Sequence, residues 1–337
     1  MSNQTWIDVD VLDAWPLSLP RRLRPAEAGT NNLSRFVDTH AGSYFLRIYQ
    51  NTADTARIRY EHALLSQLQQ AGLPFAVPRP LATRHGATYT VLAHAERRAV
   101  AALFPVIAGQ HPQRNNAAHA LICGEALAVL HTALARIDMD LAISSPATYG
   151  DLAHVHPLVQ DPLSLIQDLP IHQVERARLR ALFEDLLPQL PDLYDRLPRQ
   201  IIHGDYGRSN ALLRDGRVSG VLDFEFASPD LRAMDVTVAL WSFGVAPWQT
   251  ERDWALIEAI VAGYGQRSAL TGAEVAALPT LLRLREATAL VHWVGRLRQG
   301  LTTADDIAER AGGMLDVDHW LQAHGAELLR RVEQALL

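Results

Sequence analysis

The chain has 337 residues and a mass of 37.3 kDa, with 48% hydrophobic and 20% charged residues, so it is neither disordered nor fibrous. Its formal net charge of −6 argues against a general nucleic-acid binder, because such proteins neutralise phosphates with a basic face. The charge is uneven: residues 1–102 sum to +3 and residues 103–337 to −9. The length exceeds that of a usual single domain, which leads us to expect two lobes around a cleft.

The first residues carry Asp8, Asp10 and Asp13, where a signal peptide would have basic residues and an apolar core. No run of about 20 apolar residues follows, so we expect a cytoplasmic protein with no membrane partner. The single cysteine, Cys123, cannot form an internal disulfide. All 31 basic residues are arginine, an absence of lysine that bears on mechanism below.

The first hundred residues predict mostly strands. Alternating aromatic-containing runs at 33–38 and 43–49 flank the turn-like residues 39–42, which predicts a hairpin. Residues 55–70 follow with three-to-four apolar spacing and a stop at Ala71-Gly72, which predicts a helix. A further strand pair is expected at residues 87–93 and 99–104.

From residue 113 onward helical patterns dominate, beginning with a predicted helix over 116–135. A short β-like insertion spans 200–226, where the apolar runs 210–213 and 218–222 flank the turn signal Arg-Asp-Gly-Arg. This order predicts an α+β, two-lobed protein-kinase-like fold. The predicted N-lobe is residues 1–103, β-rich and nucleotide-binding, and the predicted C-lobe is residues 104–337, mainly helical with an internal catalytic hairpin.

The insertion carries the residues with chemical potential. Asp205 and Asn210 have the spacing of a kinase catalytic loop, in which Asp accepts the substrate proton and Asn binds Mg²⁺. Asp223, after the hairpin, stands where a second metal-binding carboxylate belongs. A turn amide for Asn210 and a capping Asp223 are structural alternatives for each residue singly, but they explain the set poorly.

The segments HGDYGRSNALL (203–213) and GVLDFEFASPDLRAMDV (220–236) resemble the signature of the aminoglycoside phosphotransferase and choline kinase superfamily. The chain looks closest to the branch that contains type II homoserine kinases. The resemblance covers nearly the whole chain, including an opening nucleotide loop at 29–32, a first-lobe helix from Tyr60-Glu61, and GEALAVLH at 124–131.

This resemblance implies ATP and Mg²⁺ as cofactors, with Asp205 as catalytic base and Asn210 and Asp223 as magnesium ligands. It implies that Glu61 pairs with the phosphate-binding cation, and that His203 and Asp235 brace the catalytic loop. The remaining nucleotide contacts that it implies are Gly29 and Thr30 in the loop, and Phe104 and Val106 in the hinge segment 103–106 that reads adenine.

One position departs from the kinase pattern. Strand 44–49 should present a lysine to the ATP phosphates, and Arg47 occupies the site instead. Arginine can grip phosphate through two donors, but its planar head is not interchangeable with lysine. An exposed strand residue is the alternative interpretation of Arg47.

Two features bear on the acceptor. The −9 balance of the second segment would attract an amine-bearing substrate or simply form a solvated surface. In the predicted helix 281–298, Arg285, His292 and Arg296 share one face, which would bind a substrate carboxylate if it lines the cleft and would solubilise the helix if it faces water. Glu225 is a further candidate for acceptor binding.

We therefore expect a kinase that transfers the γ-phosphate of ATP to a hydroxyl of a small metabolite: a homoserine-like amino acid, an amino alcohol or an amino sugar. A stress-response-type protein kinase and a nucleotide-binding pseudokinase are alternatives on the same fold. A metal hydrolase using some of the 14 histidines has no supporting motif such as H-E-x-x-H. A monomer and a homodimer are both compatible with the sequence.

Overall fold

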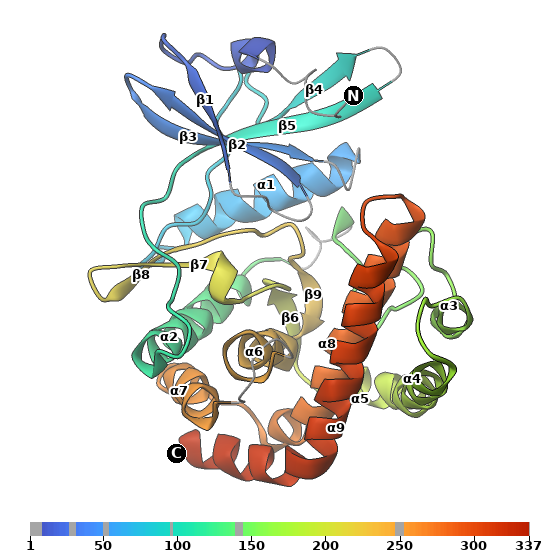
Figure 1. Ribbon diagram of the computed structural model, residues 1–337. Helices are drawn as coiled ribbons and strands as arrows, with labels where there is room; N and C mark the ends of the chain where they lie inside the picture. The colour runs from blue at the N-terminus through green and yellow to red at the C-terminus, as the bar shows by residue number, and fades with distance from the viewer. Residues whose placement is uncertain are drawn as a thin grey trace. The chain divides into compact units, whose positions relative to one another are not determined.

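A computed structural model describes residues 9–26, 32–49, 54–94, 97–138, 144–246 and 253–336. The chain forms two compact units, one of Met1–Gly109 with Ser219–Leu222 and the other of Gln110–Val218 with Asp223–Leu337. The first is built on a sheet and the second is mainly helical (Figure 1). This order of elements confirms the predicted α+β class.

Unit 1 is built on an antiparallel sheet of order β1-β2-β3-β5-β4. The strands are β1 (Arg22–Pro25), β2 (Asn32–Thr39), β3 (Gly42–Tyr49), β4 (Thr90–His94) and β5 (Arg97–Pro105). The predicted hairpin is confirmed as β2 and β3, with Thr39 opposite Gly42 at its turn. The sequence pattern missed β1 because its four residues include two arginines and a proline and show no apolar alternation.

The core of unit 1 lies on one face of this sheet. Leu12 and Trp15, in and just after the short helix Val9–Ala14, pack with Leu46 and Ile48 of β3, and all four are almost fully buried. The indole Nε1 of Trp15 donates to the Leu81 carbonyl at 3.1 Å, which satisfies its one polar group. This packing holds β3 in place.

Helix α1 (Thr55–Gln70) has the bounds that the sequence predicts. Asp54 caps it by accepting a hydrogen bond from the Ala56 amide at 2.8 Å, and Gly72 follows its end with a φ of 70°. Glu61 and His62 are buried in the middle of the helix, and the Tyr49 hydroxyl lies within hydrogen-bonding distance of both side chains.

Unit 2 contains the remaining helices and two small sheets. Its helices are α2 (Ala117–Leu134), α3 (Pro162–Gln167), α4 (Gln173–Leu186), α5 (Leu190–Arg196), α6 (Arg232–Leu240), α7 (Trp254–Gly265), α8 (Gly272–Arg298) and α9 (Ala304–Ala335). The sheets pair β6 (Arg199–Ile202) with β9 (Ser228–Leu231), and β7 (Ala211–Arg214) with β8 (Arg217–Val221), whose last residues belong to unit 1. The second pair is the predicted hairpin, with Asp215 and Gly216 at positive φ in its turn.

Helices α2 and α7 lie side by side (Figure 1) at very short range. A Cβ on Gly124 would come within 2.0 Å of the Ile260 carbonyl oxygen, and a Cβ on Gly263 within 1.9 Å of the Leu121 carbonyl oxygen.

Among the described residues, α2 alone is long and apolar enough to cross a membrane, but 56% of it is buried inside the protein, as in a core helix. Its Cys123 is buried, which raises the pKa of the thiol to about 12.

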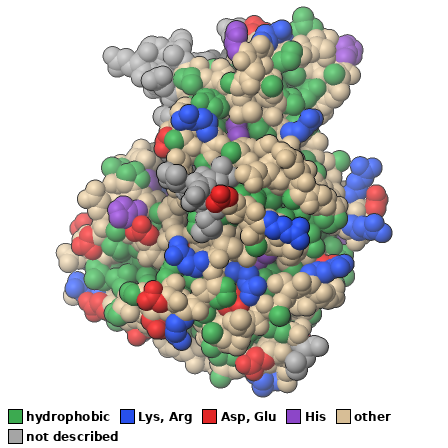
Figure 2. All heavy atoms as spheres, turned by 180° about the vertical axis from the view of Figure 1, so that it is seen from behind, with side chains coloured by type: hydrophobic (Ala, Val, Ile, Leu, Met, Phe, Trp, Pro, Cys, Tyr) green, Lys and Arg blue, Asp and Glu red, His purple; other side chains and the backbone are tan. Residues whose placement is uncertain are grey.

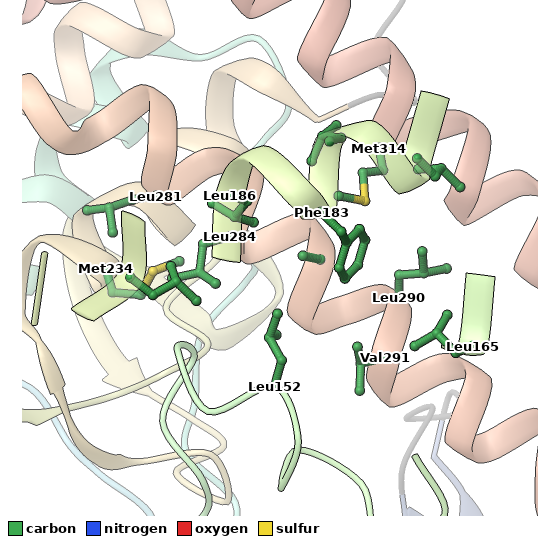
Figure 3. Packing of buried hydrophobic residues seen from close by; sticks show 14 of the residues in the cluster. Leu152, Leu165, Phe183, Leu186, Met234, Leu281, Leu284, Leu290, Val291 and Met314 are labelled. Atoms are coloured by element: carbon green, nitrogen blue, oxygen red, sulfur yellow. The ribbon is translucent and has the colours of Figure 1, made fainter. Parts of the chain in front are cut away.

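The main core of unit 2 gathers around Phe183 of α4, with Leu290 of α8 and Met314 of α9 (Figure 3). Helix α8 begins nine residues before the predicted start, because Thr271 and Glu274 form a capping box and Pro279 is accommodated inside the helix. Arg283 pairs with Asp318 at 2.7 Å and links α8 to the long helix α9. Figure 2 shows arginines interspersed with acidic and apolar side chains on one face of the molecule.

Candidate active site

A buried carboxylate on α6 fixes the loop between β6 and β7. Asp235 is fully buried, and its oxygens accept hydrogen bonds from the backbone amides of His203 at 2.6 Å and Gly204 at 2.8 Å. His131 of α2 contacts the same carboxylate through Nε2 at 3.0 Å. The loop backbone is therefore tied to two helices of unit 2.

Only glycine fits at position 204. Its φ is +79°, and a Cβ there would lie 2.3 Å from the carbonyl oxygen of Phe226. Tyr149 donates to the Gly204 carbonyl at 2.6 Å, while its own amide donates to the fully buried Asp230 at 2.7 Å. Tyr149, in the segment before α3, thus supports the turn that presents Asp205, and Asp230 of β9 in turn holds the backbone of Tyr149.

Asp205 is oriented by its neighbours in the loop. Its amide donates to Nδ1 of His203 at 3.1 Å, and its Oδ2 accepts from Nδ2 of Asn210 at 2.9 Å. Nδ2 of Asn210 also donates to the Asp205 carbonyl at 2.8 Å. Since both bonds use the amide nitrogen, Oδ1 of Asn210 is left to bind another group.

Negative charge accumulates at this loop. The pKa of Asp205 is raised to about 7 by loss of hydration and then by the charges of Asp223 and Glu225, against the opposing influence of Arg285 and Asn210. Asp223 has a φ of +65°, a left-handed backbone uncommon outside glycine. The strained position and the repulsion both occur where the sequence predicts a metal carboxylate.

A magnesium ion suits these residues. Mg²⁺ usually takes one or two carboxylates, with phosphates and water completing the shell. Asp223 would supply a carboxylate and Asn210 its Oδ1, and the cation would relieve the repulsion that raises the pKa of Asp205. Within the described parts of the chain, no three His, Cys, Asp or Glu side chains gather as a metal site, so the histidine-based hydrolase gains no support.

The predicted arginine face of α8 does not point into water. Arg285 has only 15% of its side chain exposed, Arg296 is buried, and His292 is half-buried between the rings of Phe226 and Trp293. Arg285 acts on the charge of Asp205, and Glu225 acts on that of Arg296. The solubilising interpretation is therefore wrong, and the face adjoins the catalytic loop.

In unit 1, Arg47 of β3 pairs with Glu61 of α1 at 3.2 Å, and 12% of its side chain is exposed, so it is not an exposed strand residue. Tyr49 donates to the other oxygen of Glu61 at 3.0 Å. Burial, and then the charge of Arg47, lower the pKa of His62 to about 4, so His62 is neutral near pH 7. The glutamate is thus held from both oxygens by two residues of one strand.

The predicted adenine-reading segment lies at the end of β5. The ring of Phe104 is buried beside His62, and Val106 is exposed. The amide of Val106 donates to the Ser43 carbonyl at 3.1 Å, so this donor is already paired within unit 1. Gly29 and Thr30, predicted in the nucleotide loop, lie outside the described residues.

Sequence reasoning missed Tyr149, whose hydroxyl donates to the Gly204 carbonyl at 2.6 Å. Tyr149 lies in a segment without apolar periodicity, and the contact joins residues 55 positions apart, so the sequence carries no local signal for it.

Residues 22–278, most of the chain, match the phosphotransferase enzyme family. The chain belongs to that family. It is 31% identical over 285 residues to a homoserine kinase of Gluconacetobacter diazotrophicus, covering 82% of this chain and 83% of the relative. A homoserine kinase of Caulobacter vibrioides is 28% identical over 321 residues, with 93% of each chain covered. This phosphotransferase therefore has an alcohol group as its acceptor, and the predicted resemblance is confirmed.

Solved structures confirm the two-lobed kinase-like fold of this phosphotransferase. The structure of a microcompartment-associated aminopropanol kinase matches with a TM-score of 0.69 at 20% identity, covering 94% of this chain and 98% of the other. An amicoumacin kinase in complex with AMP-PNP and Ca²⁺ matches with a TM-score of 0.67 at 16% identity, with 91% of each chain covered.

The raised pKa of Asp205 predicts a pH-dependent cost to stability. Because folding raises its pKa from 3.8 to about 7, Asp205 favours the folded state below pH 4, and this contribution is lost as pH rises through about 7. In metal-free buffer, Asp205→Asn should raise the free energy of unfolding at pH 8 by ~1 to 3 kcal/mol and leave it nearly unchanged at pH 4.

Urea unfolding at both pH values measures this difference, with Asp195→Asn on the exposed face of α5 as the control. An equal effect of Asp205→Asn at pH 4 and pH 8 would contradict the assignment.

Proposed function

We propose that this phosphotransferase is an ATP- and Mg²⁺-dependent kinase that transfers the γ-phosphate to the hydroxyl of a small, homoserine-like metabolite. The observation that carries the proposal is the braced loop that holds Asp205 against Asn210 and beside the charge of Asp223. Residues 1–103 would form the nucleotide-binding lobe, and residues 104–337 the catalytic and acceptor-binding lobe.

Asp205 has the properties of a general base for the acceptor hydroxyl. It accepts the hydroxyl proton as the new oxygen–phosphorus bond forms, while the bond to the departing ADP breaks. The bonds from Asn210 and from the loop backbone hold the carboxylate in one orientation, so positioning needs little rearrangement.

Asp223 and Asn210 would hold the magnesium ion. Bound Mg·ATP supplies the phosphoryl group and neutralises the charge that develops on it. The amicoumacin kinase structure contains AMP-PNP and Ca²⁺, which supports the proposal that this fold binds a nucleoside triphosphate together with a divalent cation. In unit 1, Arg47 would contact the phosphates while Glu61 and Tyr49 fix its position.

Homoserine is the acceptor that the relatives favour, since homoserine kinases match at about 30% identity over most of both chains. An amino alcohol is the second candidate, because the aminopropanol kinase structure covers 94% of this chain. We place the reaction in the cytoplasm, where ATP is abundant.

The proposal is tested by release of ADP with homoserine and Mg²⁺. Asp205→Asn should lower kcat by ~10²-fold or more while ATP still binds, because the acceptor hydroxyl loses its base.

Asp223→Ala should abolish the tightening of ATP binding by Mg²⁺, as measured by calorimetry, because the cation loses a carboxylate ligand. Near-normal turnover of Asp205→Asn, or unchanged Mg·ATP affinity of Asp223→Ala, would overturn these roles.

Substitutions of Arg47 test whether its guanidinium group binds the ATP phosphates during catalysis. If it binds phosphate, Arg47→Ala should raise the KM for ATP by ~10- to 100-fold and lower kcat, since a charge-assisted hydrogen bond contributes ~1.5 to 3 kcal/mol. Arg47→Lys keeps the charge and removes the fork, so it should retain partial activity if charge is the main requirement.

The nearby Arg35 of β2 offers a control, because its Nη1 bonds only the Ser34 carbonyl within the described residues. Arg35→Ala should leave ATP kinetics intact. If Arg47→Ala also leaves them intact, another arginine must bind the phosphates.

A further inference from the structure

Two arginines of unit 2 are each stacked on a tryptophan. The guanidinium carbon of Arg285 in α8 lies 3.1 Å from the ring centroid of Trp241, and that of Arg310 in α9 lies 3.6 Å from that of Trp293. Stacking of this kind fixes the plane of the guanidinium and leaves its edge, which carries the N–H donors, available to a ligand. Both arginines are therefore held in place before any ligand arrives.

Arg285 has an acidic hydrogen-bond partner, whereas Arg310 does not. Nη1 of Arg285 donates to Glu286 at 2.7 Å, but Arg310 has no hydrogen bond or ion pair within the described residues. Its Nε is buried without a hydrogen-bond partner. A buried donor without a partner is costly, so the arrangement favours a ligand that supplies an acceptor.

The two guanidinium groups also repel each other. Burial lowers the pKa of Arg310, and the charge of Arg285 lowers it further, whereas Glu286 opposes this effect. Glu309 and Asp306 oppose it more weakly, and Asp306 already accepts hydrogen bonds from Thr302 and Thr303 at 2.7 Å. Among the described residues, Glu286 is the one carboxylate bonded directly to either arginine, so Arg310 has no counter-charge at hydrogen-bonding distance.

Helix α8, which carries Arg285, is tied to the catalytic loop: Thr288 donates to the Tyr149 carbonyl at 3.0 Å, and the Tyr149 hydroxyl donates to the Gly204 carbonyl at 2.6 Å. Arg285 is the strongest of the groups that lower the pKa of Asp205. A single arginine stacked on a tryptophan is enough to stabilise a fold. A second arginine nearby adds repulsion between like charges, which lowers the stability of the folded state. An anionic group delivered with the acceptor would satisfy Arg310 and offset the repulsion.

We infer that Arg285 and Arg310 bind a carboxylate of the acceptor, so that the enzyme selects hydroxy acids or hydroxy amino acids over amino alcohols and amino sugars. The inference rests on the proposed kinase function and names the acceptor class. A carboxylate would supply the directly bound counter-charge that Arg310 lacks, and its two oxygens suit the planar donors of arginine.

Three acceptors that differ in one group test it. Homoserine has a carboxylate and an ammonium group, 3-aminopropan-1-ol lacks the carboxylate, and 4-hydroxybutanoate lacks the ammonium. Wild-type kcat/KM should be at least ~10-fold higher for homoserine than for 3-aminopropan-1-ol, because a charge-assisted contact is lost.

Arg310→Gln should raise the KM for homoserine by ~10- to 100-fold and change kcat/KM for 3-aminopropan-1-ol by less than about threefold. Arg310→Lys should lie between wild type and Arg310→Gln for homoserine. Arg330→Gln, an exposed arginine of the same helix, is the control and should match wild type with both acceptors.

Equal wild-type turnover of homoserine and 3-aminopropan-1-ol, or equal losses on both in Arg310→Gln and Arg310→Lys, would overturn the inference and leave the kinase function standing. If none of the three acceptors is phosphorylated, the proposed function fails instead. Calorimetry with AMP-PNP present then decides the inference. Tighter binding of homoserine and 4-hydroxybutanoate than of 3-aminopropan-1-ol would support it, and equal or absent binding would overturn it.

Discussion

The fully buried carboxylate of Asp235 is the constraint on which the catalytic loop depends. Removing a carboxylate from water is unfavourable unless hydrogen bonds replace its hydration, and here two loop amides and His131 do so. The same bonds fix the backbone that presents Asp205. Gly204 can follow this path because it has no Cβ to meet the Phe226 carbonyl.

The charges around that loop fall into two groups. Asp205, Asp223 and Glu225 form an acidic group that suits a divalent cation, whereas Arg285 and Arg310 leave positive charge for an anion. A polycationic acceptor would be repelled by the arginines, and a zwitterionic acceptor would meet complementary charge. The fold is shared with kinases of chemically diverse acceptors, so the fold by itself does not identify the substrate.

The sequence predicts helices, hairpins and turns well where the residues that determine them are neighbours in the chain. The hairpin of β2 and β3, helix α1 and the β7–β8 turn follow from alternation, capping and turn residues close together in the chain. The loop residues Asp205, Asn210 and Asp223 follow from spacing and resemblance. The stacks of Arg285 on Trp241 and Arg310 on Trp293 could not be predicted, because each joins residues far apart in sequence and only tertiary packing brings them together. Pro279 likewise hid the true start of α8.

The central claim is that this chain moves a phosphoryl group from ATP to the hydroxyl of a small acceptor at Asp205. Phosphorus NMR of the enzyme with Mg·ATP and homoserine tests it most directly, because it identifies the product rather than the loss of ATP. The account predicts a phosphomonoester resonance coupled to a neighbouring methylene group, formed in step with ADP and nearly absent with Asp205→Asn. Formation of inorganic phosphate alone, or equal ester formation by Asp205→Asn, would contradict it.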